Sequence, residues 1–548
     1  MRIKRTLALF LMVCLCLAMF AGCSQDNPST TATTAKPTET TKGTTTDKVP
    51  EEVELSFYFW SDATPNDMDL VIEEFEKRTA DTLNIKLNFI FTPLSDFNNK
   101  VNVRLAAGEA VDFAFDAPWQ NMNTNILKGY YHKLDDYFNN PDYPGLYKAF
   151  SKNYIENNRF IDGTGEYHTY GIPYTRAYGN TSAIVIRKDL REKYKLEPIE
   201  SIEDLEVFFK KVLENENGMI PHTYIGSSVP SYVNSGFVQP KVKDKVMPWI
   251  QISNNGFWVR VVKQGDGSVM VYSSMDDYSS APAPWNTEWT PTYVRELLKT
   301  WRQKGFVEKD VINQDSDFGM LKAGAAASIG GDSANIYSWE KELKTVIPDA
   351  ALELFIINED ERNQKDGSLS TKFQAWNFGC LPVTSKYPDR TMAFFNWIYE
   401  DQANHDLFEN GIAGKHFNAV GADKYELPAN LSVVYNLAGY QLTWNPTYVR
   451  YAVDYPEQAL SYEKWFLQDK AYFKDPLTGF TLNIKPIENE VTMVGQVYYD
   501  GAVLLGATDV TDIPAKTAEI LQKMNAVGYQ KIKDEVARQV QEFWAKQK

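Results

Sequence analysis

An alternation of strand and helix patterns at the start of the folded body limits the possible folds more than any other feature of this sequence. Residues 53–60 and 85–91 alternate apolar and polar positions as strands do, and residues 111–115 form a third short apolar run. Between these runs, residues 64–78 and 95–107 carry apolar side chains at the spacing of a buried helix face. The order predicts a parallel sheet with helical crossovers, which is an α/β fold.

The side chains that follow the first and third predicted strands are the first candidates for a binding site. In open α/β sheets, ligands bind beyond the carboxyl ends of the strands. Trp60, Ser61 and Asp62 follow the first strand, and Trp119 follows the third. We therefore expect these side chains to line one crevice. Alternatively, Asp62 caps the next helix.

The amino terminus has the pattern of an export signal. Basic residues at positions 2, 4 and 5 precede the apolar run 7–20, which is shorter than the roughly 20 residues of a membrane-spanning helix. Residues 20–23 read Phe-Ala-Gly-Cys and resemble the lipobox of bacterial lipoproteins, although Phe20 stands where leucine is usual. The resemblance implies a signal peptide over residues 1–22 and lipid on Cys23. An ordinary secretory peptide with a chance cysteine is the alternative.

The segment that follows the cysteine supports an anchored protein. Residues 23–52 are rich in Thr, Ser and Pro and contain almost no large apolar side chain. Such a segment cannot bury enough surface to offset the entropy of ordering, so we expect a disordered tether. The predicted location is the outer face of the cell membrane, with the protein held there by its lipid.

Charge and cysteine content exclude other classes of protein. The formal net charge is −16, and nucleic acid is an unfavourable partner because phosphate binding needs a basic surface. After loss of the signal and lipidation of Cys23, Cys380 is the one cysteine left, so no intrachain disulfide can form. About 500 residues are enough for two or more domains with large cores.

Several later segments also have clear local patterns. The predicted features are a capped helix beginning at Ser201 with Asp204, a helix capped by Thr290, a small-residue strand over 325–330, helices over 390–410, and two terminal helices over 514–548 that break at Gly528.

The order of motifs resembles a known family. Residues 105–112 are similar to its L-A-x-G-E-x-x-D step, 167–173 contain its Y-G-I-P segment, and 186–205 resemble its R-x-D and T-x-x-E-L segments. Residues 407–417 are similar to its G-I-x-G-K-H-Y stretch. The chain thereby resembles the extracellular solute-binding proteins of ABC importers, family 1, and more narrowly the LipO-type lipoproteins of Gram-positive bacteria.

This resemblance implies an architecture and a function. It implies a two-lobed periplasmic-binding-protein-like fold with a ligand cleft between the lobes and a helical C-terminal extension. Residues 53–177 would begin lobe 1, residues 178–375 would form mainly lobe 2, and residues 376–548 would supply crossing segments and C-terminal helices that complete both lobes. The implied function is capture of a sugar or oligosaccharide and its delivery to the transmembrane subunits of an ABC permease.

Sugar recognition needs flat aromatic faces and planar polar groups, which guides the choice of candidate residues. Most aromatic side chains of any chain belong to its core, and Arg176 could instead pair with a surface acid. Trp285 lies in a loop that we expect to expose it. The candidate ligand-binding residues are Trp60, Ser61, Asp62, Trp119, Tyr174, Arg176, Trp285, Asp332, Trp376 and Trp444.

We expect neither a metal nor another cofactor. The five histidines have no metal-ligand spacing, and residues 214–221 lack the alternating carboxylates of a calcium loop.

Two other functions remain open from the sequence. A peptide-binding, other solute-binding or sensor protein is one. A secreted carbohydrate-active enzyme is the less favoured one, and it would need a carboxylate pair from among Asp62, Asp112, Asp116 and Asp332.

Overall fold

The computed structural model describes residues 49–546, apart from 230–246, 254–255, 284, 288–289 and 314–316. The expected signal peptide, the expected lipid attachment site at Cys23 and most of the expected tether therefore lie outside the described residues. Within the described part, no helix combines the length and the apolar character needed to cross a membrane.

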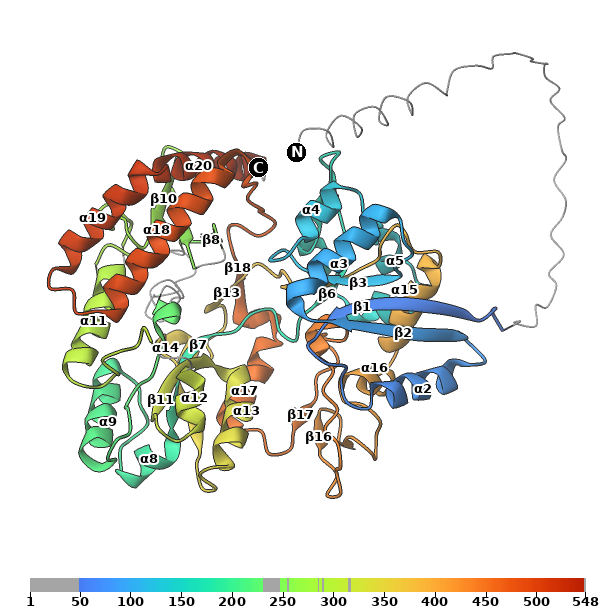
Figure 1. Ribbon diagram of the computed structural model, residues 1–548, viewed down its shortest axis with the longest axis horizontal. Coiled ribbons are helices and arrows are strands. Elements are labelled where there is room, and N and C mark those ends of the chain that lie inside the picture. Colours follow the sequence, from blue (N-terminus) through green and yellow to red (C-terminus); the bar gives the residue numbers. More distant parts are fainter. Residues whose placement is uncertain are drawn as a thin grey trace, which may run out of the picture. The chain divides into compact units, whose positions relative to one another are not determined.

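A five-stranded sheet organises the first core (Figure 1). Its strands, in spatial order, are β2 (Ile85–Thr92), β1 (Val53–Trp60), β3 (Phe113–Asp116), β14 (Asn377–Cys380) and β6 (Gly171–Tyr174). β1 pairs in parallel with β2 and β3, as the alternation of strands and helices predicted. β14 returns from much later in the chain and pairs antiparallel with both β3 and β6.

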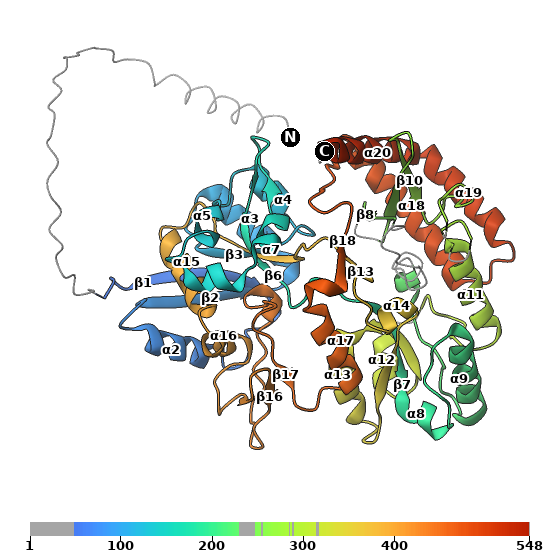
Figure 2. The ribbon, with the colours of Figure 1, turned by 180° about the vertical axis from the view of Figure 1, so that it is seen from behind.

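Helices cover both faces of this sheet (Figures 1 and 2). On one face, the rings of Phe57 and Phe113 pack against Phe394 and Phe395 of α15. The helices of this core are α2 (Met68–Thr79), α3 (Leu94–Ala107), α4 (Met122–Leu127), α5 (Asp135–Phe138), α6 (Pro144–Ala149), α7 (Lys152–Asn157), α15 (Pro388–Ile398) and α16 (Gln402–Glu409). A small hairpin formed by β4 (Phe160–Ile161) and β5 (Tyr167–His168) follows α7 in the chain.

The start of α2 differs from the predicted one. The sequence predicted a helix over residues 64–78, but α2 begins at Met68 and Asp67 precedes it in the left-handed region at φ 52°. The carboxylate of Asp67 accepts from buried His416 at 3.1 Å and pairs with Lys415 at 2.9 Å. These partners fix the start of α2, and they are about 350 residues away in the sequence, so the residues around position 64 do not reveal it.

A second core surrounds the antiparallel sheet β11 (Ser328–Asp332), β7 (Ser182–Arg187) and β12 (Leu352–Phe355). Alternate residues of β7 face opposite helix layers: Ile184 and Ile186 pack with α9 and α11, whereas Ala183 and Val185 pack with α13 and α17. The helices here are α8 (Lys188–Lys193), α9 (Ile202–Asn215), α11 (Pro291–Gln303), α12 (Asp317–Lys322), α13 (Ser333–Lys344), α14 (Glu359–Arg362) and α17 (Glu457–Phe466). The predicted caps at Ser201 and Thr290 are both confirmed.

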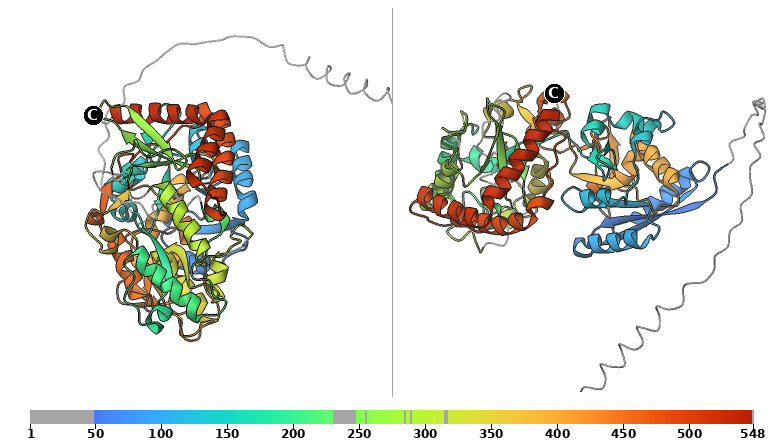
Figure 3. Two further views of the ribbon diagram at one scale, coloured as in Figure 1. Left: turned by 90° about the vertical axis from the view of Figure 1, so that its left-hand side faces the viewer. Right: turned by 90° about the horizontal axis from the view of Figure 1, so that it is seen from above.

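A third cluster joins a small sheet to the C-terminal helices. Strands β8 (Trp249–Gln251), β9 (Trp258–Lys263) and β10 (Val269–Ser273) pack on α18 (Glu488–Ala507), α19 (Ile513–Ala526) and α20 (Tyr529–Lys546). Figure 3 shows these three helices in red beside the green strands. The predicted break at Gly528 is confirmed, with φ at 107°.

Segments of chain that pass between the first and second cores pack on one another. Tyr178 contacts both cores, and its ring lies 5.3 Å from that of Phe373 and 6.3 Å from that of Tyr472. The short elements in and near these segments are β13 (Leu369–Thr371), β15 (Asn418–Val420), β16 (Lys424–Glu426), β17 (Tyr451–Ala452) and β18 (Tyr472–Lys474), with 3-10 turns η1 (Gly226–Ser228), η2 (Gly439–Gln441), η3 (Asp469–Ala471) and η4 (Lys485–Ile487).

Candidate functional site

Aromatic rings gather where the chain leaves β1 and β3. The rings of Trp119 and Phe115 are 6.2 Å apart, and Phe115 lies 6.3 Å from Tyr440. Tyr440 in turn lies 5.6 Å from Trp60 and 5.8 Å from Trp444. We call these five residues the aromatic edge. Sequence reasoning anticipated its three tryptophans but missed Tyr440, which no local pattern distinguishes from a core tyrosine.

Backbone bonds from a distant segment fix the aromatic edge. The side-chain amide of Gln441 accepts from the Trp60 backbone N–H at 3.0 Å and donates to the Trp60 carbonyl at 2.9 Å. The indole N–H of Trp60 is buried and has no hydrogen-bond partner among the described residues. The indole N–H of Trp119 donates to Asn377 Oδ1 at 3.2 Å, and its ring is 37% exposed. The aromatic edge therefore contains one unpartnered donor, the indole N–H of Trp60, and one accessible ring, that of Trp119.

Arg176 adds a charged group at the end of this edge. Its guanidinium donates to Glu409 Oε1 at 2.6 Å and lies 5.4 Å from the centre of the Trp444 ring. Burial opposes ionisation of Glu409, but the charges of Arg176 and His405 and the hydrogen bonds from Thr443 and Arg176 together keep the pKa of that carboxyl below its usual value. Arg176 therefore has an acidic partner, but this acid is largely buried and is not the surface acid of the alternative expectation. Nevertheless 42% of the Arg176 side chain remains exposed beside the aromatic edge.

Two acidic side chains of the second core are partly buried, and the charge of Arg176 acts on one of them, Glu463. Burial raises the pKa of the Glu463 carboxyl on α17, and the charge of Arg176 acts in the opposite direction. Glu463 accepts from Ser333 Oγ at 2.6 Å. The adjacent Asp332 caps α13 by accepting from the Asn335 N–H at 3.1 Å, and burial raises its pKa.

A pair of tyrosines lies next to these acids. The rings of Tyr337 and Tyr455 stack at 5.0 Å, and the hydroxyl of Tyr455 donates to the Ser333 carbonyl at 3.2 Å. Together with Asp332 and Glu463, this pair gives the second core a flat aromatic surface and two hydrogen-bond acceptors. None of these residues except Asp332 was a sequence-based candidate.

The remaining predicted residues have different environments. Tyr174 is 1% exposed and lies inside the first core, so we leave it out of the proposed ligand surface. Trp285 is 2% exposed, so the expectation of an exposed loop residue was wrong; Arg260 covers its ring at 5.1 Å. Trp376, by contrast, is 60% exposed, and it precedes Asn377, which accepts the hydrogen bond from the Trp119 indole. Asp62 is exposed, and it does not cap α2, whose N-cap is Asp67.

Ser61 and two of the acids considered for catalysis are held by structural hydrogen bonds. Ser61 Oγ donates to the Ala63 carbonyl at 2.6 Å. Buried Asp116 accepts from Tyr131 at 2.6 Å and from Asn125 at 3.0 Å, and Asp112 accepts from the Ser56 backbone at 2.9 Å. These bonds account for Asp116 and Asp112 as parts of the fold.

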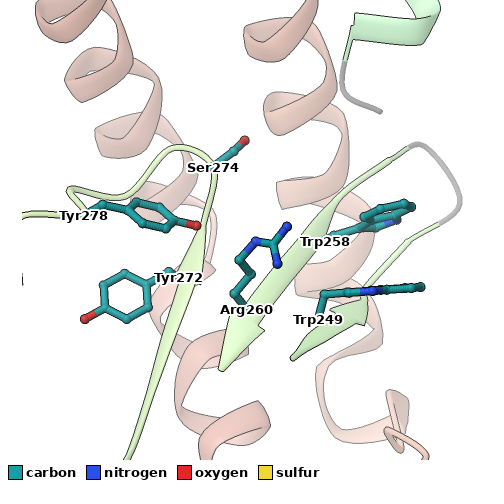
Figure 4. Close-up of a pocket in the computed structure, with 6 residues that line it drawn as sticks. All are labelled: Trp249, Trp258, Arg260, Tyr272, Ser274 and Tyr278. Carbon is teal, nitrogen blue, oxygen red and sulfur yellow. The ribbon is translucent and has the colours of Figure 1, made fainter. Parts of the chain in front are cut away.

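A separate pocket lies on the small sheet of the third cluster (Figure 4). Its described lining consists of Trp249, Trp258, Arg260, Tyr272, Ser274 and Tyr278. The indole rings of Trp249 and Trp258 stack at 4.7 Å with 17° between their planes. The sequence analysis did not anticipate this pocket.

Among the described residues, no group of three or more His, Cys, Asp or Glu side chains is arranged to hold a metal ion. The absence of calcium from the loop over residues 214–221 stays a prediction.

The comparisons with known proteins concern both the family and the fold. A family model described as bacterial extracellular solute-binding protein matches residues 61–405, and a model of a domain of unknown function (DUF3502) matches residues 476–545. Comparison with curated proteins found no match.

Solved structures of solute-binding proteins are similar over most of the chain. The N-glycan transport solute binding protein (NgtS) from Streptococcus pneumoniae is 18% identical, with 90% of this chain and 100% of that chain covered and a TM-score of 0.68. An HMO binding, ABC-transporter-associated solute binding protein from Bifidobacterium longum infantis is 14% identical, with 90% of this chain and 99% of that chain covered and a TM-score of 0.61.

These similarities confirm the two-lobed α/β fold expected from the sequence. Since the family model spans well over half of the sequence, this chain belongs to the bacterial extracellular solute-binding proteins.

Proposed function

We propose that this protein captures an oligosaccharide between its two lobes and delivers it to the transmembrane subunits of an ABC permease. The aromatic edge is the observation that carries the proposal. Trp60, Trp119, Tyr440 and Trp444 gather at the carboxyl ends of β1 and β3, where open α/β sheets bind ligands. Such rings stack on the apolar C–H face of a pyranose.

The polar groups near the edge suit sugar hydroxyls. Arg176 offers donors, while Asp332 and Glu463 of the second core offer acceptors. Because the two sets belong to different cores, a ligand that binds both favours the closed form of the protein. A permease that recognises the closed form would then receive loaded protein.

The ligands of similar proteins support the same class of solute. The NgtS protein has been crystallised in complex with Man1GlcNAc, in a structure that is 17% identical to this chain with a TM-score of 0.61. The protein from Bifidobacterium longum infantis binds HMO. We extend carbohydrate binding to this chain on that basis, together with its own aromatic edge.

Lipid attachment at Cys23 completes the proposal. A lipid anchor followed by a Thr-, Ser- and Pro-rich tether would keep the binding lobes close to the permease at the outer face of the membrane. It would also raise the local concentration of loaded protein around the transporter.

Calorimetric titration of the mature protein with neutral oligosaccharides and with peptides tests the proposed solute. Trp119→Ala and Trp444→Ala should each weaken oligosaccharide binding about tenfold, since one stacked aromatic contributes about 0.5–1.5 kcal/mol beyond its buried area. Tyr387→Ala is the matched control, because Tyr387 is 39% exposed against 37% for Trp119. Unchanged affinity in both tryptophan variants, or binding of peptides alone, would refute the proposal.

A further inference from the structure

Trp444 is the member of the aromatic edge whose backbone lies outside the helices and strands. It is in the irregular stretch of chain between η2 and β17. Its N–H donates to the Gly439 carbonyl at 2.9 Å, and its carbonyl accepts from the Thr175 N–H at 3.2 Å. The position of this indole therefore depends on single contacts, and several of them involve the residue just before it, Thr443.

Helix α16 binds both polar groups of Thr443. His405 and Glu409 are one helical turn apart, so their side chains lie on the same face of this helix. Nε2 of His405 donates to the Thr443 carbonyl at 2.9 Å, and the Thr443 hydroxyl donates to Oε2 of Glu409. The Gly439 carbonyl, at 3.3 Å, is the farther acceptor for that hydroxyl. One face of α16 thus fixes the backbone and the side chain of Thr443 together.

The imidazole of His405 is in the state that this contact needs. Because a carbonyl can only accept, the ring must carry its proton on Nε2. His405 is almost fully buried, and burial lowers the pKa of its imidazole, so the neutral ring predominates at neutral pH. Its Nδ1 has no hydrogen-bond partner among the described residues, and the ring stacks on that of Tyr448 at 5.2 Å. The bond to Thr443 therefore orients the ring.

The carboxylate of Glu409 connects Thr443 to Arg176. Its Oε1 accepts from Arg176 at 2.6 Å, while its Oε2 accepts from Thr443. The guanidinium of Arg176 lies 5.4 Å from the centre of the Trp444 ring, and Trp444 follows Thr443 directly in the chain. These contacts form a closed circuit, so a displacement of Thr443 moves the indole and the guanidinium relative to each other. Thr443 itself is fully buried and cannot reach a solute.

We infer that Thr443 is a positioning residue of the ligand site, which α16 holds in place and which in turn holds the Trp444 indole against Arg176. The inference rests on the proposed function and adds to it a residue that acts without touching the ligand. An aromatic ring and a guanidinium that are already in place lose less freedom when a sugar binds, so the affinity is higher.

Two substitutions of Thr443 test the role of its hydroxyl. Thr443→Val keeps the shape of the side chain but removes the donor, and we expect it to weaken oligosaccharide binding about three- to tenfold. Thr443→Ser keeps the hydroxyl and should restore most of that affinity. Thr79→Val is the matched control, because Thr79 is also fully buried and its hydroxyl donates to the Phe75 carbonyl within α2 at 3.0 Å. This control should lose stability in urea denaturation but bind as the native protein does.

A spectroscopic measurement follows the indole directly. The chain contains 13 tryptophans, and in protein labelled with fluorotryptophan the resonance of Trp444 is the one missing from Trp444→Phe. In the ligand-free protein this resonance should shift or broaden in Thr443→Val and keep its native position in Thr443→Ser and Thr79→Val. His405→Met should act like Thr443→Val. His405→Gln keeps an N–H donor for the Thr443 carbonyl and should preserve the native signal.

The outcomes distinguish this inference from the proposed function. An unchanged Trp444 resonance or an unchanged affinity in Thr443→Val would overturn the inference alone. Equal effects of the valine and serine variants, or of the two His405 variants, would also overturn it, because a loss without rescue reflects packing and not the hydrogen bond. If the native protein binds no oligosaccharide, the proposed function fails, and the resonance of the ligand-free protein still decides whether Thr443 positions Trp444.

Discussion

The ion pair between Arg176 and Glu409 allows a quantitative test of the candidate site. Arg176→Met removes the cation and leaves Glu409, whose side chain is 10% exposed, with Thr443 as its remaining hydrogen-bond partner among the described residues. Removing one partner of a fully buried pair costs about 3–5 kcal/mol, whereas exposed pairs contribute about 0–1 kcal/mol. Since 42% of the Arg176 side chain is exposed, we expect a loss of about 2 kcal/mol in the free energy of unfolding at neutral pH.

The pH dependence of this loss follows from the protonation of Glu409. In the native protein, Arg176, His405 and Thr443 together hold the pKa of Glu409 below its usual value despite burial, so the ionised carboxylate stabilises the fold above its unfolded-state pKa. That stability disappears as the pH falls through the folded-state pKa. In Arg176→Met, burial is opposed only by the weaker influences of His405 and Thr443, so we expect the pKa of Glu409 to rise and protonation to relieve the penalty at mildly acidic pH.

Urea denaturation of both proteins at neutral pH and at about pH 4 measures the effect. The difference between native protein and Arg176→Met should be large at neutral pH and small in acid. Glu409→Gln should remove most of the penalty from the arginine variant, which a double-mutant cycle would record as a coupling energy. An equal difference at both pH values, or simple additivity of the two substitutions, would refute this account of the pair.

Other predictions concern single residues. Ser201→Ala removes the capping box of α9 and should lower the free energy of unfolding by about 1 kcal/mol in the same assay, whereas an unchanged midpoint would contradict it. Gly439→Ala would place a Cβ in overlap with Glu409 Oε2 and 2.6 Å from Trp444 Cδ1. This overpacking should cost about 1–3 kcal/mol and weaken oligosaccharide binding, and wild-type affinity would argue against the aromatic edge. In cells that produce the protein, Cys23→Ala should abolish its labelling by a palmitate analogue and release it to the medium. Persistent labelling of the variant would exclude this cysteine as the anchor.

Rules about parallel sheets explain why part of the candidate site could be predicted. β1 and β3 are neighbours and run in the same direction, so the residues that follow them leave the sheet at one edge. Trp60 and Trp119 therefore lie near each other, each connected to Tyr440 directly or through Phe115. Prediction succeeded here because one local pattern, strand–helix–strand, fixes both the topology and the exits of the strands.

Local patterns failed where burial depends on distant segments. Tyr174 follows a proline in a four-residue strand, and it is buried because β14, about 200 residues later, pairs with that strand. Trp285 looked like a loop residue, but Arg260 and the cluster around Tyr272 and Tyr278 cover it. Neither covering element is identifiable from the sequence around the residue itself.

The same dependence on distant segments explains how the candidate site obtains its properties. Gln441 fixes the backbone of Trp60 across 381 positions of sequence, and Glu409 fixes Arg176 across 233. Both partners belong to the returning part of the chain, which also supplies β14 to the middle of the sheet. The aromatic edge can therefore form only after that part has joined the first core. Arg176 lies on a segment that runs from this core to β7, and its charge reaches Glu463 of the second core. A change in the position of one core relative to the other must alter the electrostatic environment of Arg176, and a ligand that contacted both cores would be coupled to that change.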